Sequence, residues 1–180
     1  LLYEEDLKNS MAVEQIVGKE KPEAILHLAA QMNVRVSVEN PILDAQENIL
    51  GSLHCLEAAV KHGVKKFVFA SSGGTVYGVQ KTFPATEDHP TAPHSPYGVA
   101  KLAVEHYLRF YHEVHGLETV SLRLANVYGP RQNPLGEAGV VAIFLNKLLQ
   151  GKAPTIFGDG EQTRDYIHVS DVARAFLVAL

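Results

Sequence analysis

The segment Phe67-Val-Phe-Ala-Ser-Ser-Gly-Gly74 is a continuous apolar run that ends at once in hydroxyl side chains and glycines. An apolar run of this kind, without alternation, is typical of a strand that is buried on both faces. Residues 24–30 and 119–124 also read as buried strands, and stretches that read as helices separate the three. Buried strands that alternate with helices predict a parallel sheet covered on both faces. We therefore expect an α/β fold with a doubly wound parallel sheet.

Helix caps and chain breakers set the bounds of the expected elements. One long helix is expected to begin at Pro41 and to stop at Gly63. A loop rich in glycine and proline over 71–95 precedes a second helix over 97–115. The remaining expected elements are a helix near 140–150, a strand over 154–157 and a final helix that begins near 170–171.

Composition excludes several classes of protein. The chain has 180 residues and a formal net charge of −4, so no nucleic-acid partner is expected. No apolar run approaches the roughly 18 residues that cross a bilayer, so no membrane partner is expected. The single cysteine, Cys55, is typical of a reducing cytosol, which indicates a cytoplasmic protein. His112 and His115 lack the i, i+4 spacing of a helical zinc site, so no metal is expected.

Parallel sheets bind their ligands at the carboxyl ends of the strands. This rule directs attention to the segments 29–31, 71–74 and 124–126. Further along the chain, the glycine-rich turn 157–166 contains Arg164, which suits the binding of a diphosphate. A turn with a surface arginine is the alternative interpretation of that segment.

The pattern Tyr-x-x-x-Lys occurs twice, at Tyr77/Lys81 and at Tyr97/Lys101. Only the second pair lies at the start of an expected helix, where residues i and i+4 share one face about 5–6 Å apart. A lysine ammonium at that distance favours the tyrosinate, and so lowers the pKa of the phenol and makes it a usable acid and base. The alternative is a surface pair on an amphipathic helix.

Four segments, in this order and at this spacing, resemble those of the extended short-chain dehydrogenase/reductase family. They are 71–78, Ser95-Pro-Tyr-Gly-Val-Ala-Lys101, 122–131 and Arg164-Asp-Tyr-Ile-His-Val-Ser-Asp171. Within the family, the nucleotide-sugar 4-epimerases that act on UDP-glucose and UDP-galactose are the most similar. The resemblance covers nearly the whole chain, and it implies a Rossmann-like sheet, NAD as cofactor and a UDP-sugar as substrate.

The resemblance also implies a role for each residue at a matching position. In the family, NAD takes a hydride from C4 of the sugar, and the 4-keto sugar turns over and receives it on the other face. Tyr97 would take the proton of the 4-hydroxyl, while Lys101 would hold the nicotinamide ribose. The positions that match cofactor contacts are Asp6, Leu7, Leu28, Ala29, Ala30, Gln31, Asn48, Tyr97, Lys101 and Ala125.

One position departs from the pattern that the resemblance implies. The family usually has Ser or Thr where this chain has Gly73, and that hydroxyl bridges the sugar and the tyrosine. Ser72 or Thr75 must supply it here, and we favour Ser72 as the third catalytic residue. The positions that match substrate contacts are Ser72, Thr75, Asn126, Thr155, Ile156, Phe157 and Arg164.

Several functions stay open at this point. Gly74 and Thr75 stand where the dehydratases and decarboxylases of the family carry acids. Without an acid to protonate a leaving hydroxyl, epimerisation is favoured over dehydration. The alternatives are a 4-epimerase of UDP-glucuronate or UDP-N-acetylglucosamine and, from another class, a non-catalytic nucleotide-binding relative or an inactive fragment. Gly73 favours the non-catalytic alternative.

Both ends of the chain read as cut, so we expect a sheet that is incomplete at both ends. A dinucleotide fold begins with a strand, a glycine-rich turn and a helix, and no such glycine pattern is present. Residues 1–6 read as the third strand of that order. We expect a partial NAD-binding domain over 1–136 and a partial substrate-binding region with a returning helix over 137–180. The resemblance further implies a homodimer through the helices 41–62 and 97–115.

Overall fold

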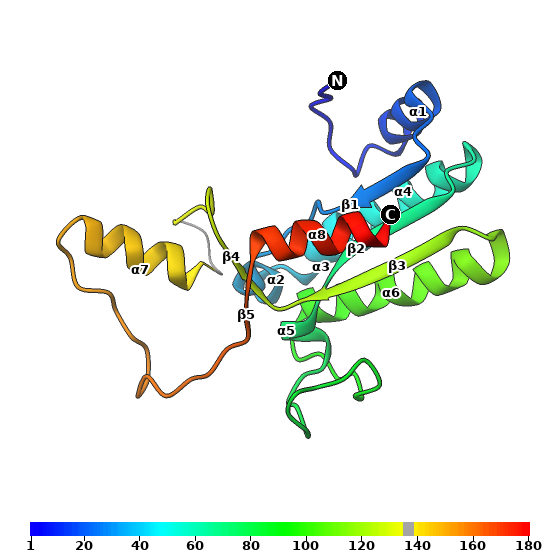
Figure 1. Cartoon of the computed structure of the whole chain (residues 1–180). Helices are drawn as coiled ribbons and strands as arrows, with labels where there is room; N and C mark the ends of the chain where they lie inside the picture. Colours follow the sequence, from blue (N-terminus) through cyan, green and yellow to red (C-terminus); the bar gives the residue numbers. More distant parts are fainter. Residues whose placement is uncertain (135–138) are drawn as a thin grey trace.

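The computed structural model of the chain describes residues 1–134 and 139–180. Three parallel strands form its central sheet in the order β1-β2-β3: β1 (Ala24–His27), β2 (Lys66–Ser72) and β3 (Glu118–Leu124) (Figure 1). In the register, Phe67 of β2 lies between Ile25 of β1 and Thr119 of β3. The three expected strands and their parallel arrangement are confirmed.

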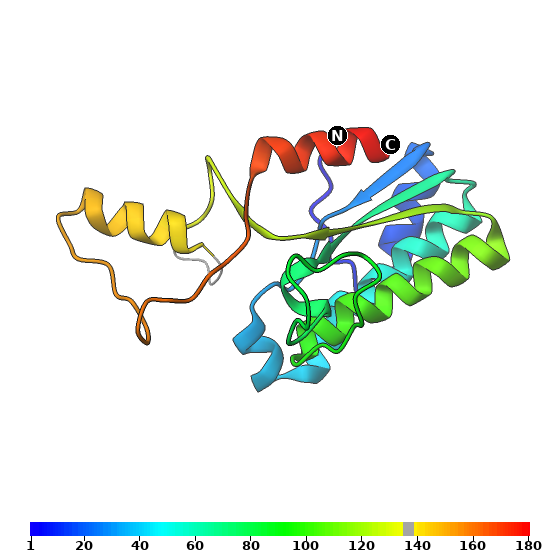
Figure 2. The ribbon, with the colours of Figure 1, turned by 60° about the horizontal axis from the view of Figure 1, so that its bottom comes forward.

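Helices cover both faces of this sheet, which confirms the doubly wound arrangement. On one face lie α1 (Ser10–Glu20), α4 (Gly51–Lys61) and α6 (Pro96–His115), and on the other lies α8 (Val169–Ala179) (Figure 2). Side chains of β2 alternate between the two cores. Phe67 and Phe69 pack with Leu56 and Leu108 on the first face, and Val68 packs with Phe176 on the second.

The long helix expected over 41–63 is continuous but contains a π-helical turn. It runs through α3 (Pro41–Ala45), the π-helix η1 (Gln46–Leu50) and α4. Pro41 occupies the first turn, as expected, and Gly63 follows the helix end with a φ of +72°. The π-turn widens the helix at its middle, a feature that is common at functional sites.

Two of the strands expected from the sequence are absent. Residues 1–6 and 154–157 form no strand, and no described strand lies beside either segment to complete a ladder. Leu1, Leu2 and Phe157 are instead exposed. An apolar run becomes a strand only where a neighbouring strand satisfies its backbone groups, and the sequence of the run alone does not supply that neighbour.

The sequence also left several elements unpredicted. They include α1, α2 (Val34–Glu39), the short helix α5 (Gly73–Val76) within the expected loop 71–95, and a second parallel sheet of β4 (Asn126–Tyr128) and β5 (Tyr166–His168). The expected helix near 140–150 is α7 (Val140–Leu149). The domain boundary expected between 136 and 137 falls outside the described residues. Within the described part of the chain, no helix is long and apolar enough to cross a membrane.

Candidate active site

The start of α6 delivers Tyr97 to the carboxyl end of β2. Ser95 caps the helix, because its Oγ accepts a hydrogen bond from the backbone N of Gly98 at 3.1 Å. The helix starts very close to α5, since a Cβ placed on Gly98 would lie 3.0 Å from the carbonyl oxygen of Thr75. A glycine at this position therefore allows the approach that brings Tyr97 beside the strand end.

Tyr97, Lys101 and Ser72 come together at this point. The side chain of Ser72, the last residue of β2, hydrogen-bonds with the Tyr97 phenol. Lys101 follows Tyr97 by one helical turn and is 3% exposed. Its Nζ donates to the carbonyl oxygen of Ala70 at 2.8 Å, and it lies 4.6 Å from the ring centroid of Phe69 and 5.6 Å from that of Tyr97.

The expected effect of Lys101 on Tyr97 is wrong for the chain by itself. The sequence predicted a lowered phenol pKa, but the pKa of Tyr97 is raised. Burial is the main cause and the negative charge of Asp44 adds to it, while the hydrogen bond with Ser72 opposes both. Lys101 does not offset these effects, because its ammonium lies over the face of the phenol ring and donates to Ala70 instead. Burial also lowers the pKa of Lys101 to about 8.

The backbone around Gly73 explains why no hydroxyl side chain stands there. A Cβ on Gly73 would lie 3.0 Å from the carbonyl oxygen of Arg123 in β3, which is closer than nearly all such contacts. Of the two candidate hydroxyls, Ser72 contacts Tyr97, whereas the buried Oγ1 of Thr75 has no hydrogen-bond partner. The geometry thus brings Ser72, rather than Thr75, to the phenol.

Asn48 fastens the segment after β1 to the long helix. The backbone N of Gln31 donates to Asn48 Oδ1, and Asn48 Nδ2 donates to the backbone O of Gln31, both at 2.9 Å. Asn48 is 3% exposed and lies in the π-turn η1. Leu28, Ala29 and Ala30 are exposed on the same edge. The structure therefore brings Asn48 to the residues expected to contact a cofactor, with its amide already engaged by the backbone.

The other residues expected at the site lie at varied distances from this cluster. Asn126 is near it, since its Oδ1 would lie 3.8 Å from a Cβ placed on Gly74. Ala125, half-buried, joins β3 to β4. Asp6 is exposed and bonded to Lys8, and the carbonyl of Leu7 accepts a hydrogen bond from His54 at 2.7 Å.

Four of the expected substrate contacts are not brought to Tyr97. They follow α7 in a segment that lies apart from the central sheet in both views (Figures 1 and 2). All are exposed, and the hydrogen bonds that two of them make are local: one with Lys147 and one with the Thr163 carbonyl. These four residues are Thr155, Ile156, Phe157 and Arg164.

Two acidic residues near the site were not expected from the sequence. Asp44, in α3, is 1% exposed and accepts hydrogen bonds from the Gln31 and Asn48 side chains. Glu105, one turn after Lys101 on α6, forms an ion pair with Arg123 at 2.7 Å. The only sequence signal was an acid at the i, i+4 spacing, before Asn48 in one case and after Lys101 in the other.

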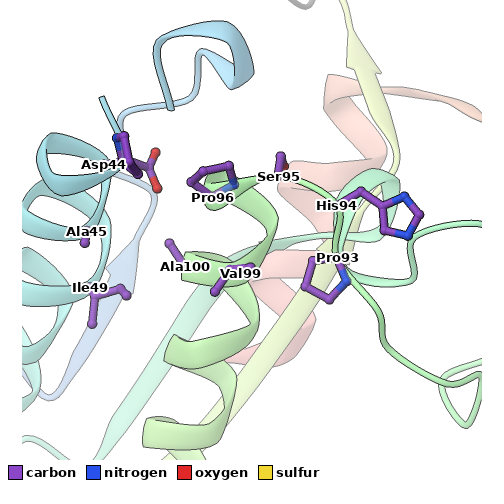
Figure 3. Close-up of a pocket in the computed structure, with 10 residues that line it drawn as sticks. Asp44, Ala45, Ile49, Pro93, His94, Ser95, Pro96, Val99 and Ala100 are labelled. Carbon is purple, nitrogen blue, oxygen red and sulfur yellow. The ribbon is translucent and has the colours of Figure 1, made fainter. Parts of the chain in front are cut away.

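A cavity of about 490 Å³ lies between the long helix and the start of α6. Figure 3 shows the carboxylate of Asp44 directed across it toward the Ser95–Pro96 turn, with Ile49 and Val99 on its sides. Apart from Asp44, Ser95 and His94, the side chains that line it are apolar.

Curated relatives share this chain's sequence closely. The UDP-glucose 4-epimerase of Mycolicibacterium smegmatis is 50% identical over 164 residues, which are 91% of this chain and 52% of that protein. The chain therefore spans about half the length of this relative.

Solved structures share the fold. The UDP-glucose 4-epimerase of Thermotoga maritima, determined with UDP-glucose, matches the whole chain and 59% of its own length, with a TM-score of 0.98 and 51% identity. The UDP-glucose 4-epimerase of Thermus thermophilus, determined with NAD, covers 98% of this chain and 58% of its own length, with a TM-score of 0.92 and 48% identity. Residues 2–180 also match the family described as NAD dependent epimerase/dehydratase, and the chain belongs to that family.

Proposed function

We propose that the full-length protein is an NAD-dependent UDP-sugar 4-epimerase that interconverts UDP-glucose and UDP-galactose. The observation that carries this proposal is the joining of Tyr97, Lys101 and Ser72 at the carboxyl end of β2. Relatives at about half sequence identity bear the name UDP-glucose 4-epimerase, which supports the same reaction.

The residues present fit NAD as the cofactor. An ammonium has three N–H donors, and the hydrogen bond that Lys101 makes within the described chain is to Ala70. Its remaining N–H groups suit the two hydroxyls of a ribose. The raised pKa of Tyr97 also suits a neighbour with positive charge, as the oxidised nicotinamide is. When bound, NAD supplies the acceptor for the hydride that leaves C4 and later returns to the opposite face.

The chain's own residues then handle one proton. Tyr97, as the tyrosinate, accepts the proton of the sugar 4-hydroxyl, and the phenol returns it when the carbonyl at C4 is reduced. Ser72 donates a hydrogen bond at the same oxygen and holds the sugar hydroxyl in reach. Lys101, fixed on Ala70, anchors the ribose and keeps a positive charge beside the phenol. Asn48 holds the Gln31 backbone in place at the cofactor edge.

The test is the Tyr97→Phe substitution in the full-length protein. Loss of the acid and base should lower kcat for UDP-galactose about 10²–10⁴-fold while the melting temperature stays close to that of the wild type. Tyr77→Phe is the matched control, because Tyr77 belongs to the other Tyr-x-x-x-Lys pattern and its hydroxyl accepts a hydrogen bond from Arg123. Near-normal epimerisation by Tyr97→Phe would contradict the proposal.

The identity of the sugar is a separate part of the proposal. Epimerases of UDP-glucuronate and UDP-N-acetylglucosamine share the same proton chemistry, so the Tyr97 variant does not separate them. A coupled assay over these three UDP-sugars does, and we expect UDP-glucose to give the highest kcat/KM. The exposed Thr155–Phe157 segment and Arg164 are proposed to reach the uridine and the diphosphate once the nucleotide is bound.

We also propose that the protein is a homodimer. Large apolar side chains are exposed along the two helices that the resemblance assigns to the subunit contact. A Phe110→Glu variant should sediment as a monomer and the wild type as a dimer; a monomeric wild type would contradict the assignment. The exposed apolar residues are Ile42, Leu50, Val99, Tyr107, Phe110 and Val114.

The proposal also covers the division of the chain and its cellular location. We assign residues 1–136 to the NAD-binding domain and 137–180 to the substrate-binding region with the returning helix α8. We also propose a cytoplasmic location, because the single cysteine of the chain, Cys55, has no partner within it for a disulfide, as is typical of proteins in a reducing compartment.

A further inference from the structure

Asp44 is a buried carboxylate of which only one oxygen has hydrogen-bond partners. Its side chain is 1% exposed. Oδ1 accepts hydrogen bonds from Gln31 Nε2 and Asn48 Nδ2, each at 2.9 Å. Oδ2 is buried and has no hydrogen-bond partner. A buried carboxylate is costly unless it is paired, so a carboxylate at this position calls for an explanation beyond packing.

The place of Asp44 in the fold suggests that explanation. It faces the start of α6 across the cavity lined by Ser95, Pro96 and Ala100 (Figure 3). That stretch of α6 carries the acid and base Tyr97 and the ammonium of Lys101. Asp44 interacts electrostatically with both: its negative charge raises the pKa of Tyr97 and opposes the fall in the pKa of Lys101 that burial causes.

The other ionisable groups around this site do not replace Asp44. His94 lines the same cavity from the segment before α6, and it is exposed. The helix α2, which packs on α3, carries Arg35 and Glu39, and both are exposed. His27, at the end of β1, is buried, and the charge of Lys101 together with burial lowers its pKa to about 4, so it is neutral near pH 7.

We propose that Asp44 is a positioning residue of the epimerase site. Its negative charge keeps Lys101 an ammonium beside Tyr97, and its Oδ1 holds the side chains of Gln31 and Asn48 in place. The inference rests on the proposed 4-epimerase function, which assigns Tyr97 and Lys101 their roles. It adds a buried acid on the opposite helix that governs their protonation without touching the sugar.

The charge of Asp44 determines the direction in which its removal shifts the pKa values of Tyr97 and Lys101. A nearby negative charge raises the pKa of any group, so its removal lowers that of Tyr97 and that of Lys101 together. Tyr97 acts as a base in its deprotonated form, so activity should persist to lower pH. Lys101 acts as the ammonium, so the loss of activity on the alkaline side should begin at a lower pH. Both limbs of the pH profile of kcat/KM should therefore move toward acid.

The experiment is the Asp44→Asn substitution in the full-length holoenzyme. Asparagine has the shape of aspartate and its oxygen can still accept from Gln31 and Asn48, so these hydrogen bonds are kept and the charge is lost. We expect the pH profile to be displaced by about half a pH unit, so that the ratio of kcat/KM at pH 8 to that at pH 6.5 falls by about threefold when one of these pH values lies on a limb and by up to about tenfold when both do. Glu47→Gln, an acid removed from the same helix but paired with Lys8, is the matched control and should leave the ratio unchanged.

A second measurement does not depend on turnover. The side-chain resonances of Lys101, assigned with the Lys101→Met variant, are followed against pH in the protein without added NAD or sugar. In Asp44→Asn and in Asp44→Ser their midpoint should lie at lower pH than in the wild type. This readout tests the role of Asp44 even if the wild type fails to epimerise any UDP-sugar, which would defeat the proposed function instead.

A merely structural role predicts a different outcome. If Asp44 only supported packing, its substitution would lower kcat/KM by the same factor at every pH and would leave the Lys101 midpoint in place. Either an unmoved Lys101 midpoint in both variants or a pH profile reduced in height without displacement overturns the proposal.

Discussion

His27, at the end of β1, is held neutral by its surroundings. It is 4% exposed, stacks on Phe69 and lies beside Phe67. The hydroxyl of Ser52 donates to the carbonyl oxygen of Asn48 at 2.6 Å, so His27 Nε2 must donate to that hydroxyl, from which it is 2.8 Å away. This chain of bonds ties β1 to the π-turn that carries Asn48.

The neutral His27 makes stability depend on pH. Burial and the charge of Lys101 lower its pKa from 6.5 to about 4, so between these values the unfolded state binds more protons than the folded state. Stability should therefore be complete above pH 6.5 and fall as pH drops, by about 2–3 kcal/mol at pH 4.5.

His27→Gln, which keeps an N–H donor but does not titrate, should remove most of that loss. Urea unfolding at pH 7 and pH 4.5 measures it, and the exposed His106 provides the control in His106→Gln. An equal loss of stability in His27→Gln and in the wild type would show that groups other than His27 cause the loss of stability between pH 7 and pH 4.5.

At the scale of the element, α6 presents three polar side chains on one face. Tyr97, Lys101 and Glu105 follow one another at intervals of one turn. Glu105 accepts from Ser71 at 2.5 Å and from both the Nε and the Nη2 of Arg123. The helix α6, on which Tyr97 and Lys101 lie, is thereby joined to the end of β2 and to β3.

Arg123 extends this junction to the loop after α5. Its Nη1 donates to the Tyr77 hydroxyl and to the carbonyl oxygen of Glu87, both at 3.1 Å. The side chains of Arg123 and Glu105 are 21% and 11% exposed, so the pair is largely withdrawn from water. The loop after α5, the ends of β2 and β3, and the helix α6 therefore share one ion pair.

We expect Glu105→Gln to lower the free energy of unfolding by about 2–4 kcal/mol, because it leaves the Arg123 charge partly buried without its partner. A double-mutant cycle with Arg123→Met should give a large coupling energy. The exposed pair Arg109–Glu113 on the same helix is the matched control, and its coupling energy should be much smaller. Equal couplings for the two pairs would contradict this assignment.

At the scale of the whole molecule, the chain returns from the second sheet to cover one face of the central sheet. The strand β5 pairs with β4, and α8 follows at once to cover the face of Val68. Phe176, 5% exposed, is the largest buried side chain that α8 contributes to this core, while the adjacent Leu177 is 70% exposed.

Phe176→Ala should therefore lower the free energy of unfolding by about 3–4 kcal/mol, whereas Leu177→Ala should change it by less than about 0.5 kcal/mol. Calorimetry of the two full-length variants measures the difference. A similar effect of both substitutions would mean that α8 does not pack on the sheet through Phe176.

Local sequence patterns predicted much of the architecture. Apolar runs predicted β1, β2 and β3, and the helix expected over 97–115 is α6, which begins one residue earlier and ends at the expected residue. The one-turn spacing of Tyr97 and Lys101 follows from helix geometry alone. In each case the information lies within a few residues of the feature that it specifies.

Contacts between distant residues decided the rest. The runs 1–6 and 154–157 lack a partner strand, and the pairing of β4 with β5 joins residues about forty positions apart, so neither outcome could be found from local pattern. The pKa of Tyr97 was expected in the wrong direction because the sequence showed Lys101 but not the depth of burial or the charge of Asp44. Spacing along a helix specifies which side chains share a face, whereas burial and electrostatic partners exist only once the chain has folded.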